Sequence, residues 1–219
     1  MHTTAPTTIG RETELGLFRR VLTGLQDRAG HTVLLVGEAG IGKSRLAGEY
    51  AGLAESRGLP VLRGRGSPTS AGIPYRPLIE ALHSRFRVTG VPQDRELESY
   101  RPALGRVIPE WRHTAVPGYP ESAVELAEAV LRLLAVLGRD RGCLLVLEDL
   151  HEADSETIAV VDYLVDNLAG LPVLLAATLR PEPGAALELA RVGAQGAVGG
   201  GEVEGHSAIS GTSMRRPSA

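Results

Sequence analysis

The residues from Gly37 to Ser44 have the types and the spacing that could bind a phosphate chain. Their order, Gly-x-x-x-x-Gly-Lys-Ser, is that of a phosphate-binding P-loop. Glycines let successive backbone N–H groups surround phosphate oxygens, and the N-terminus of a following helix adds partial positive charge. Lys43 would reach the β- and γ-phosphates, and the Ser44 hydroxyl would ligate Mg²⁺. We therefore predict a nucleotide site formed by Gly37, Glu38, Ala39, Gly40, Ile41, Gly42, Lys43, Ser44 and Arg45.

The amino-acid usage of the chain sharpens the assignment of Lys43. Of the 23 lysine and arginine residues, Lys43 is the single lysine. A compact ammonium on a flexible stem is not replaceable by a planar guanidinium at a crowded phosphate site. The alternative is a glycine-rich turn that matches the pattern by chance. An apolar run at 32–36 and a helical pattern from 43 to about 57 flank the loop, and this context favours phosphate binding.

A second stretch that could do chemistry ends in two adjacent acids. Residues 143–147 are apolar, and Glu148 and Asp149 follow them. Such a run suits a strand in the middle of a parallel sheet, with carboxylates at its carboxyl end. Carboxylate oxygens bind Mg²⁺ and can polarise a water molecule for hydrolysis. Many buried strands end in an acid, so the interpretation as a Walker B strand depends on the P-loop that precedes it.

Two further polar residues lie beside predicted elements. Asp154 precedes a helix expected over 155–168, and its expected role is to cap that helix. Arg180 follows an apolar strand expected over 172–179 and precedes Pro181, which ends the strand. An arginine at this edge can contact the γ-phosphate of a nucleotide. The alternative is an ordinary solvated loop arginine.

These motifs need a sheet that brings the carboxyl ends of its strands to one edge. Strands are expected at 32–36, 60–66, 143–148 and 172–179, with amphipathic helices between them. The pattern predicts an α/β fold, a three-layer sandwich with a mostly parallel sheet. Residues 88–120 lack a clean period and are expected to form short helices joined by loops, with Trp111 as a local anchor.

Composition excludes several classes of function. Apolar residues make up 43% of the chain and charged residues 22%, as in soluble globular proteins. A net charge of −3 gives no general attraction to nucleic acids or to anionic membranes. No apolar run approaches the roughly 18 residues of a membrane helix, and no signal-peptide core is visible at the N-terminus. The single cysteine, Cys143, is expected to be a buried thiol, and we expect a cytoplasmic protein.

Together, these segments resemble the ATP-binding domain of the large LuxR-type transcriptional regulators. That family belongs to the signal-transduction ATPases with numerous domains (STAND), a branch of the AAA-like P-loop NTPases. The matching segments are residues 9–12, 37–46, 61–66 with 74–77, 144–154 and 178–181.

The resemblance implies roles for individual residues and a mode of action. ATP and Mg²⁺ would be the ligands, and ATP binding would hold an active, often oligomeric state that slow hydrolysis resets to the ADP form. By the same resemblance, Gly10, Arg11 and Glu12 would lie against the adenine, Ser44 and Glu148 would hold the metal, and the catalytic set would be Glu148, Asp149 and Arg180.

The chain departs from the family pattern at two positions. Glu148 stands where the family has aspartate, and Glu152 stands where it has tryptophan. Glutamate can still bind Mg²⁺, but its extra methylene moves the carboxylate, so slow turnover is expected.

The division of the chain is predicted from composition and from the resemblance. Residues 1–8 are expected to be disordered, residues 9–185 to form the ATP-binding domain, and the glycine-rich residues 186–219 to be a disordered tail. A fifth strand, which the resemblance places beside the first, is expected to be missing along with any DNA-binding element. The strand at 32–36 would then lie at an open edge and invite self-association.

Two other functions remain open at this stage. The chain could be a free-standing P-loop ATPase or small-molecule kinase, although no arginine-rich lid is visible after Arg180. It could also be a non-functional fragment of a larger regulator. Phosphate release with and without acceptors separates the switch from the kinase, and soluble expression tests the fragment.

Overall fold

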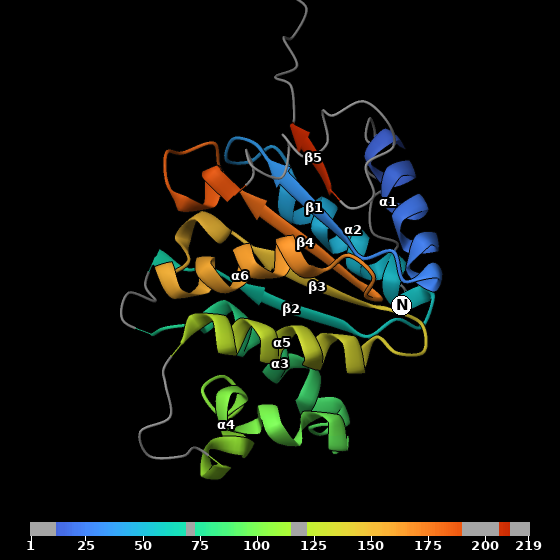
Figure 1. The fold of residues 1–219 in the computed structure, drawn as a ribbon. Coiled ribbons are helices and arrows are strands. Elements are labelled where there is room, and N and C mark those ends of the chain that lie inside the picture. The colour runs from blue at the N-terminus through green and yellow to red at the C-terminus, as the bar shows by residue number, and fades with distance from the viewer. Residues whose placement is uncertain (1–11, 69–72, 115–121, 190–205, 211–219) are drawn as a thin grey trace, which may run out of the picture.

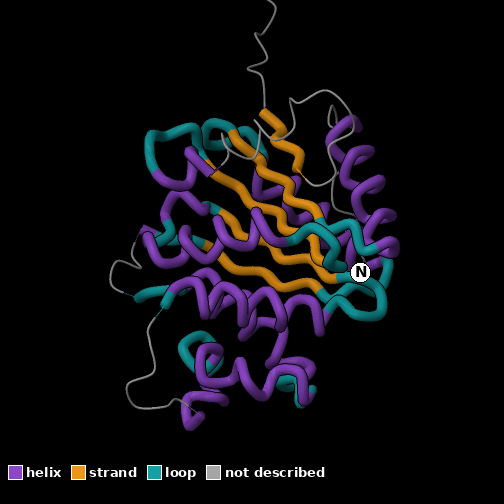
Figure 2. Tube along the Cα trace, viewed as in Figure 1, coloured by secondary structure: helices purple, strands orange, loops and turns teal. Residues whose placement is uncertain are grey.

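One parallel sheet organises the residues that the computed structural model describes, which are 12–68, 73–114, 122–189 and 206–210. Its strands lie side by side in the order β2-β3-β4-β1-β5 (Figures 1 and 2). Their bounds are β1 His31–Val36, β2 Val61–Arg65, β3 Cys143–Glu148, β4 Val173–Leu179 and β5 His206–Ser210. The main helices are α1 Glu12–Gly24, α2 Lys43–Ser56, α3 Arg76–Thr89, α5 Ala123–Leu137 and α6 Ser155–Asn167.

Helices cover both faces of this sheet, which confirms the predicted three-layer α/β fold. The helices α1 and α2 pack on one face, and α3, α5 and α6 pack on the other (Figure 1). The strands are apolar on both sides because alternate residues enter different cores: Leu34 joins the α3/α5/α6 side, and Val33 and Leu35 join the α1/α2 side. All seven residues of β4, at the centre of the sheet, are buried.

The packing of α1 on α2 is fixed by two aromatic rings. Phe18 and Tyr50 are both fully buried and stack with ring centroids 3.7 Å apart and an interplanar angle of 3°. The Tyr50 hydroxyl also donates a hydrogen bond to the Glu14 carbonyl at 3.3 Å. Because aromatic residues are scarce in this chain, this pair locates α1 firmly beside the helix that follows the P-loop.

The expectation that β1 lies at an open edge is wrong. Strand β5 pairs with β1 in parallel, from Thr32 opposite His206 to Val36 opposite Ser210. Strand β1 therefore has a neighbour on each side, with β4 on the other, and self-association through an unpaired β1 edge is not expected. The short β5 segment lies in a glycine-rich region without periodicity, so only its distant pairing with β1 identifies it as a strand.

The predicted tail also begins too early. Residues 185–189 are helical, and Ala186 and Leu189 are buried against the core. The packed part of the chain thus continues beyond the predicted boundary at 185. The predicted disordered N-terminus, residues 1–8, lies outside the described residues.

The segment without clear periodicity forms the expected set of short helices. These are η3 (Arg95–Tyr100), α4 (Arg101–Leu104) and η4 (Pro109–Thr114). Trp111 is 3% exposed, and the Arg101 guanidinium lies 5.5 Å from its ring centroid. The prediction of Trp111 as a local anchor is confirmed.

Cys143 is fully buried, as expected from its place in an apolar strand. Its Sγ donates to the Leu134 carbonyl at 3.2 Å, and burial raises the pKa of the thiol to about 12. A thiol of this kind is a packing group rather than a nucleophile. Among the described residues, no helix has the length and apolar character needed to cross a bilayer.

Asp154 caps α6, as predicted, and also ties that helix to the start of α3. Its Oδ1 accepts the Thr157 N–H at 2.7 Å, and its Oδ2 accepts the Thr157 hydroxyl at 2.6 Å and the Tyr75 N–H at 3.2 Å. Thr157 is fully buried, so its hydroxyl needs this partner.

The Asp154→Ala variant is expected to lower the free energy of unfolding by about 2–3 kcal/mol. Loss of the cap costs about 1 kcal/mol. The buried Thr157 hydroxyl also loses its hydrogen-bond partner, which lowers the free energy of unfolding further. The matched control is Ser122→Ala, which removes one long 3.5 Å capping bond from Glu125 N–H at the start of α5. Urea melts should show the larger loss for Asp154→Ala; equal losses would contradict the tie between α6 and α3.

Candidate functional site

The P-loop connects β1 to α2 at the carboxyl end of the sheet. Gly40 and Gly42 adopt positive φ angles of 76° and 93°, and Gly42 is the N-cap residue directly before α2. Side chains with a Cβ rarely adopt these angles, so the loop requires the glycines that the motif places there. The predicted loop conformation, with its N–H groups ahead of a helix N-terminus, is consistent with this geometry.

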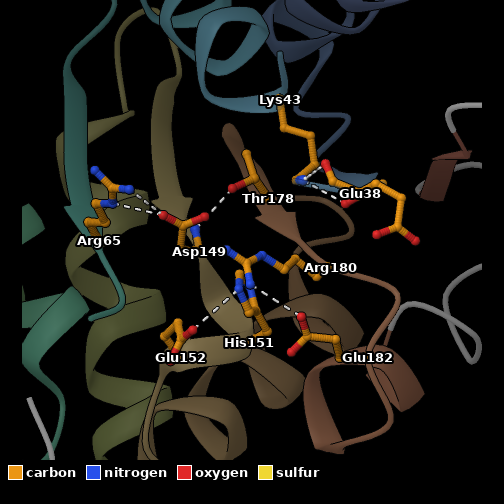
Figure 3. A network of polar contacts seen from close by, with 10 residues as sticks. Glu38, Lys43, Arg65, Asp149, His151, Glu152, Thr178, Arg180 and Glu182 are labelled. Atoms are coloured by element: carbon orange, nitrogen blue, oxygen red, sulfur yellow. Dashed lines mark hydrogen bonds and ion pairs between the residues drawn. The ribbon is translucent and has the colours of Figure 1, made fainter. Parts of the chain in front are cut away.

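The Lys43 side chain folds back across the loop. It is only 9% exposed, and its Nζ donates to the Gly37 carbonyl at 2.6 Å and to the Glu38 carbonyl at 2.8 Å (Figure 3). The ammonium is thus held at the loop by neutral carbonyl oxygens, which phosphate oxygens could replace with stronger charge-assisted bonds. Ser44 is exposed beside it, and Arg45 pairs with Glu49 at 3.6 Å along α2.

The end of β4 joins the P-loop to the acidic end of β3. The Gly37 N–H donates to the Leu179 carbonyl at 3.2 Å, and the Asp149 N–H donates to the Thr178 hydroxyl at 2.9 Å (Figure 3). Thr178 is 1% exposed, so this second bond is shielded from water. Two motifs that are far apart in the sequence are therefore held beside each other by consecutive residues of one strand.

Both acids at the end of β3 are paired with arginines of β2. Arg63 Nη2 lies 2.8 Å from Glu148 Oε1. Arg65 holds Asp149 Oδ2 with two nitrogens, Nε at 2.8 Å and Nη2 at 2.7 Å. The pairing follows from the sheet register, which places Arg65 opposite Glu148 and puts alternate residues of β2 on one face.

Arg180 follows β4 and lies at the same edge. Its Nη1 is 3.3 Å from Glu182 Oε1, and its side chain is 40% exposed. With Asp149 and His151 it lines one cavity beyond the acids (Figure 3). Its contact with a γ-phosphate stays a prediction.

Comparison with known protein families identifies the chain. The sequence profile of the AAA ATPase domain matches residues 7–176, a span that contains the P-loop, the acidic strand end and most of β4. The chain belongs to the AAA ATPase domain family. The family assignment supports nucleotide binding at the P-loop. It does not distinguish LuxR-type regulators from other members of the AAA ATPase domain family.

Solved structures and curated proteins add little to this assignment. Two similar structures are described as Drosophila ORC bound to GC-rich DNA and Cdc6, and Drosophila ORC bound to AT-rich DNA and Cdc6. The first has a TM-score of 0.38 at 12% identity and covers 84% of this chain and 57% of that one. The second has a TM-score of 0.36 at 13% identity and covers 81% and 54%. This chain thus spans little more than half the length of either, and no curated protein matches it.

The residues of this AAA ATPase domain fit a nucleotide with its metal. The loop has open space at its turn, because a Cβ on Gly40 would meet none of the described atoms within 4 Å. Lys43 and Asp149 lie at the same edge of the sheet (Figure 3), and the exposed Ser44 follows Lys43 directly in the chain. Phosphate oxygens with one or two protein ligands are the surroundings that Mg²⁺ prefers in proteins.

Part of the predicted site is not placed by the structure. Gly10 and Arg11 lie outside the described residues, and Glu12 is the first residue of α1. Their predicted contact with the adenine stays a prediction.

Sequence reasoning gave no role to four residues of the AAA ATPase domain that the structure places here, namely Arg63, Arg65, His151 and Thr178. One signal was available for the arginines. In Arg63-Gly64-Arg65 the two side chains are two residues apart at the end of a predicted strand, so they share a face of the sheet. The sheet order that brings them to Glu148 and Asp149 was not readable from the sequence.

Proposed function

We propose that this AAA ATPase domain binds Mg–ATP and acts as a slowly hydrolysing regulatory switch. The observation that carries the proposal is the double anchorage on β4. Leu179 holds the first residue of the P-loop, and Thr178 holds the Asp149 backbone. A change at the phosphate-binding loop can therefore reach the acidic end of β3 through one buried strand.

The arginine pairs favour slow hydrolysis. A carboxylate polarises water only if its oxygens are available, and Asp149 gives one oxygen to two nitrogens of Arg65. Glu148 is paired with Arg63 through a single nitrogen. Exchange of these pairs for other partners is the step that we expect to limit turnover.

The residues of the site would have separate roles in binding and hydrolysis. The loop from Gly37 to Ser44 would hold the phosphate chain, with Lys43 leaving its two carbonyl partners. Ser44 and Glu148 would hold the metal. Bound Mg–ATP would supply the phosphoryl group and the Lewis acidity, whereas Asp149 would orient the attacking water and accept its proton.

The regulatory role rests on the motifs that resemble LuxR-type STAND regulators. Segments 9–12, 37–46, 61–66 with 74–77, 144–154 and 178–181 support that finer assignment. We propose that the ATP and ADP states of this domain differ in their contacts with an effector segment or a second copy in the cytoplasm, and that this difference is the signal.

A thermal melt of the full chain with and without Mg–ATP tests the nucleotide site. A ligand at 100 times its dissociation constant that binds only the folded state adds about 2.7 kcal/mol to stability. For a domain of this size, the melting temperature should rise by roughly 5–10 °C. The rise should be absent in Lys43→Ala. If the melting temperature of the wild type were the same with and without Mg–ATP, the proposal would be contradicted.

Turnover on the same samples distinguishes a switch from an enzyme. We expect steady-state hydrolysis far below the roughly 10 s⁻¹ of a typical enzyme. Rapid hydrolysis without any partner would overturn the switch while leaving the nucleotide site intact.

A further inference from the structure

A cavity of about 380 Å³ lies beyond the acids, at the carboxyl ends of β2, β3 and β4 and the start of α3. Its charged lining includes Arg65, Arg76, Asp149, His151 and Arg180. None of the described lining residues belongs to the P-loop, residues 37–44. The cavity is therefore separate from the P-loop itself, although it shares Asp149 and Arg180 with the predicted catalytic set.

Three arginines from three different elements line this cavity, and they differ in how strongly they are paired with acidic side chains. Arg65 is held by Asp149 through two nitrogens. Arg180 has one 3.3 Å contact with Glu182, whose side chain is 57% exposed, so the pair is loosely held. Arg76 forms no ion pair with any of the described residues, although it lines the cavity. Guanidinium groups are thus available for an anion.

Acidic side chains also line the cavity, but two of them are already engaged. Glu80 Oε2 accepts the Arg65 N–H at 3.2 Å, and Asp149 binds the Arg65 guanidinium. Glu152 is the third acid. The N-terminus of α3, a 14-residue helix, adds partial positive charge, part of which the Asp154 carboxylate already offsets through its bond to the Tyr75 N–H.

His151 supplies an independent sign of a missing ligand. Its side chain is 6% exposed, and neither ring nitrogen has a hydrogen-bond partner among the residues that the structure describes. The nearest acid, Glu152, is 3.6 Å from Nε2, too far for a hydrogen bond. Buried polar groups nearly always have partners, so a buried imidazole on a cavity wall without one points to a group that enters the cavity.

We propose that this cavity binds a small molecule that carries a compact oxyanion, a phosphate or a carboxylate. Arg76 and Arg180 hold the anion, and His151 donates a hydrogen bond to it. The anion also competes with Asp149 for Arg65, so occupancy frees that carboxylate. This last effect rests on the proposed function and makes the cavity a regulatory site of the switch; binding itself does not depend on it.

The test is a titration of the full chain with inorganic phosphate, followed by the imidazole NMR signals of His151. The P-loop is first filled with saturating ADP, and the His151 signals are assigned with His151→Gln. We expect a saturable shift, and at least tenfold weaker binding in Arg76→Ala. The matched control, Arg87→Ala, removes the same charge at the exposed far end of α3 and should bind like the wild type.

Two further arms identify the anion and separate this proposal from the nucleotide site. Titration with acetate at equal ionic strength shows whether a carboxylate suffices or a phosphate is required. Titration of Lys43→Ala with phosphate should give the same His151 shift, even if ADP does not bind the wild type. A shift that does not saturate with either anion, or an equal loss in Arg76→Ala and Arg87→Ala, would overturn the proposal.

Discussion

The Lys43→Ala variant is expected to bind ATP at least tenfold more weakly than the wild type, a loss of about 1.4 kcal/mol or more. Lys43 is the only lysine in the chain, and its ammonium already lies across the P-loop, 2.6 Å from the Gly37 carbonyl and 2.8 Å from that of Glu38. No other lysine is available to the phosphates. Equilibrium binding of labelled ATP, measured with Mg²⁺, checks the prediction.

The Lys43→Arg variant should fail to restore this affinity. The side chain is 9% exposed, and a planar guanidinium does not fit a site that holds a compact ammonium between two carbonyls. The control is Arg57→Ala, which removes an exposed charge at the far end of α2 and should leave binding unchanged. If Lys43→Ala or Lys43→Arg binds ATP as tightly as the parent, the assignment of the P-loop is wrong.

The Gly64→Ala variant is expected to lose about 3 kcal/mol or more of folding stability, among the largest effects of any single methyl group in this chain. A Cβ at Gly64 would lie 1.8 Å from the Pro77 carbonyl oxygen and 2.8 Å from its carbon. Both contacts are backbone atoms of α3, so the helix itself must move. Thermal melts should show a fall of roughly 6–12 °C in melting temperature.

The Gly52→Ala variant is the matched control for this prediction. Gly52 is an exposed residue of α2, and a Cβ there meets no atom of the described residues within 4 Å. The same added methyl group should stabilise the chain by about 0.5–1 kcal/mol, because alanine loses less conformational freedom in a helix than glycine. If the two variants melted alike, the close approach of α3 to β2 would be contradicted.

The sequence determined four of the five strands and the phosphate-binding motif. The apolar runs at 32–36, 143–147 and 172–179 predicted β1, β3 and β4 to within a residue or two at each end, because strands buried on both faces are apolar throughout. The P-loop spacing placed glycines at positions 40 and 42, where the structure has positive φ angles, since the motif specifies local backbone conformation. The cap at Asp154 could also be predicted from local sequence, because its partner, the Thr157 N–H, is only three residues further along the chain.

Tertiary structure alone decided how these parts meet. The partners of Glu148 and Asp149 are Arg63 and Arg65, which are 85 and 84 residues away and depend on the pairing of β2 with β3. The fifth strand depends in the same way on its pairing with β1, and its own composition gives no strand signal. The unpartnered His151 likewise follows from burial by surrounding elements. Local patterns encode turns, caps and apolar faces, whereas contacts between strands arise from sheet order and register, which no short stretch of sequence specifies.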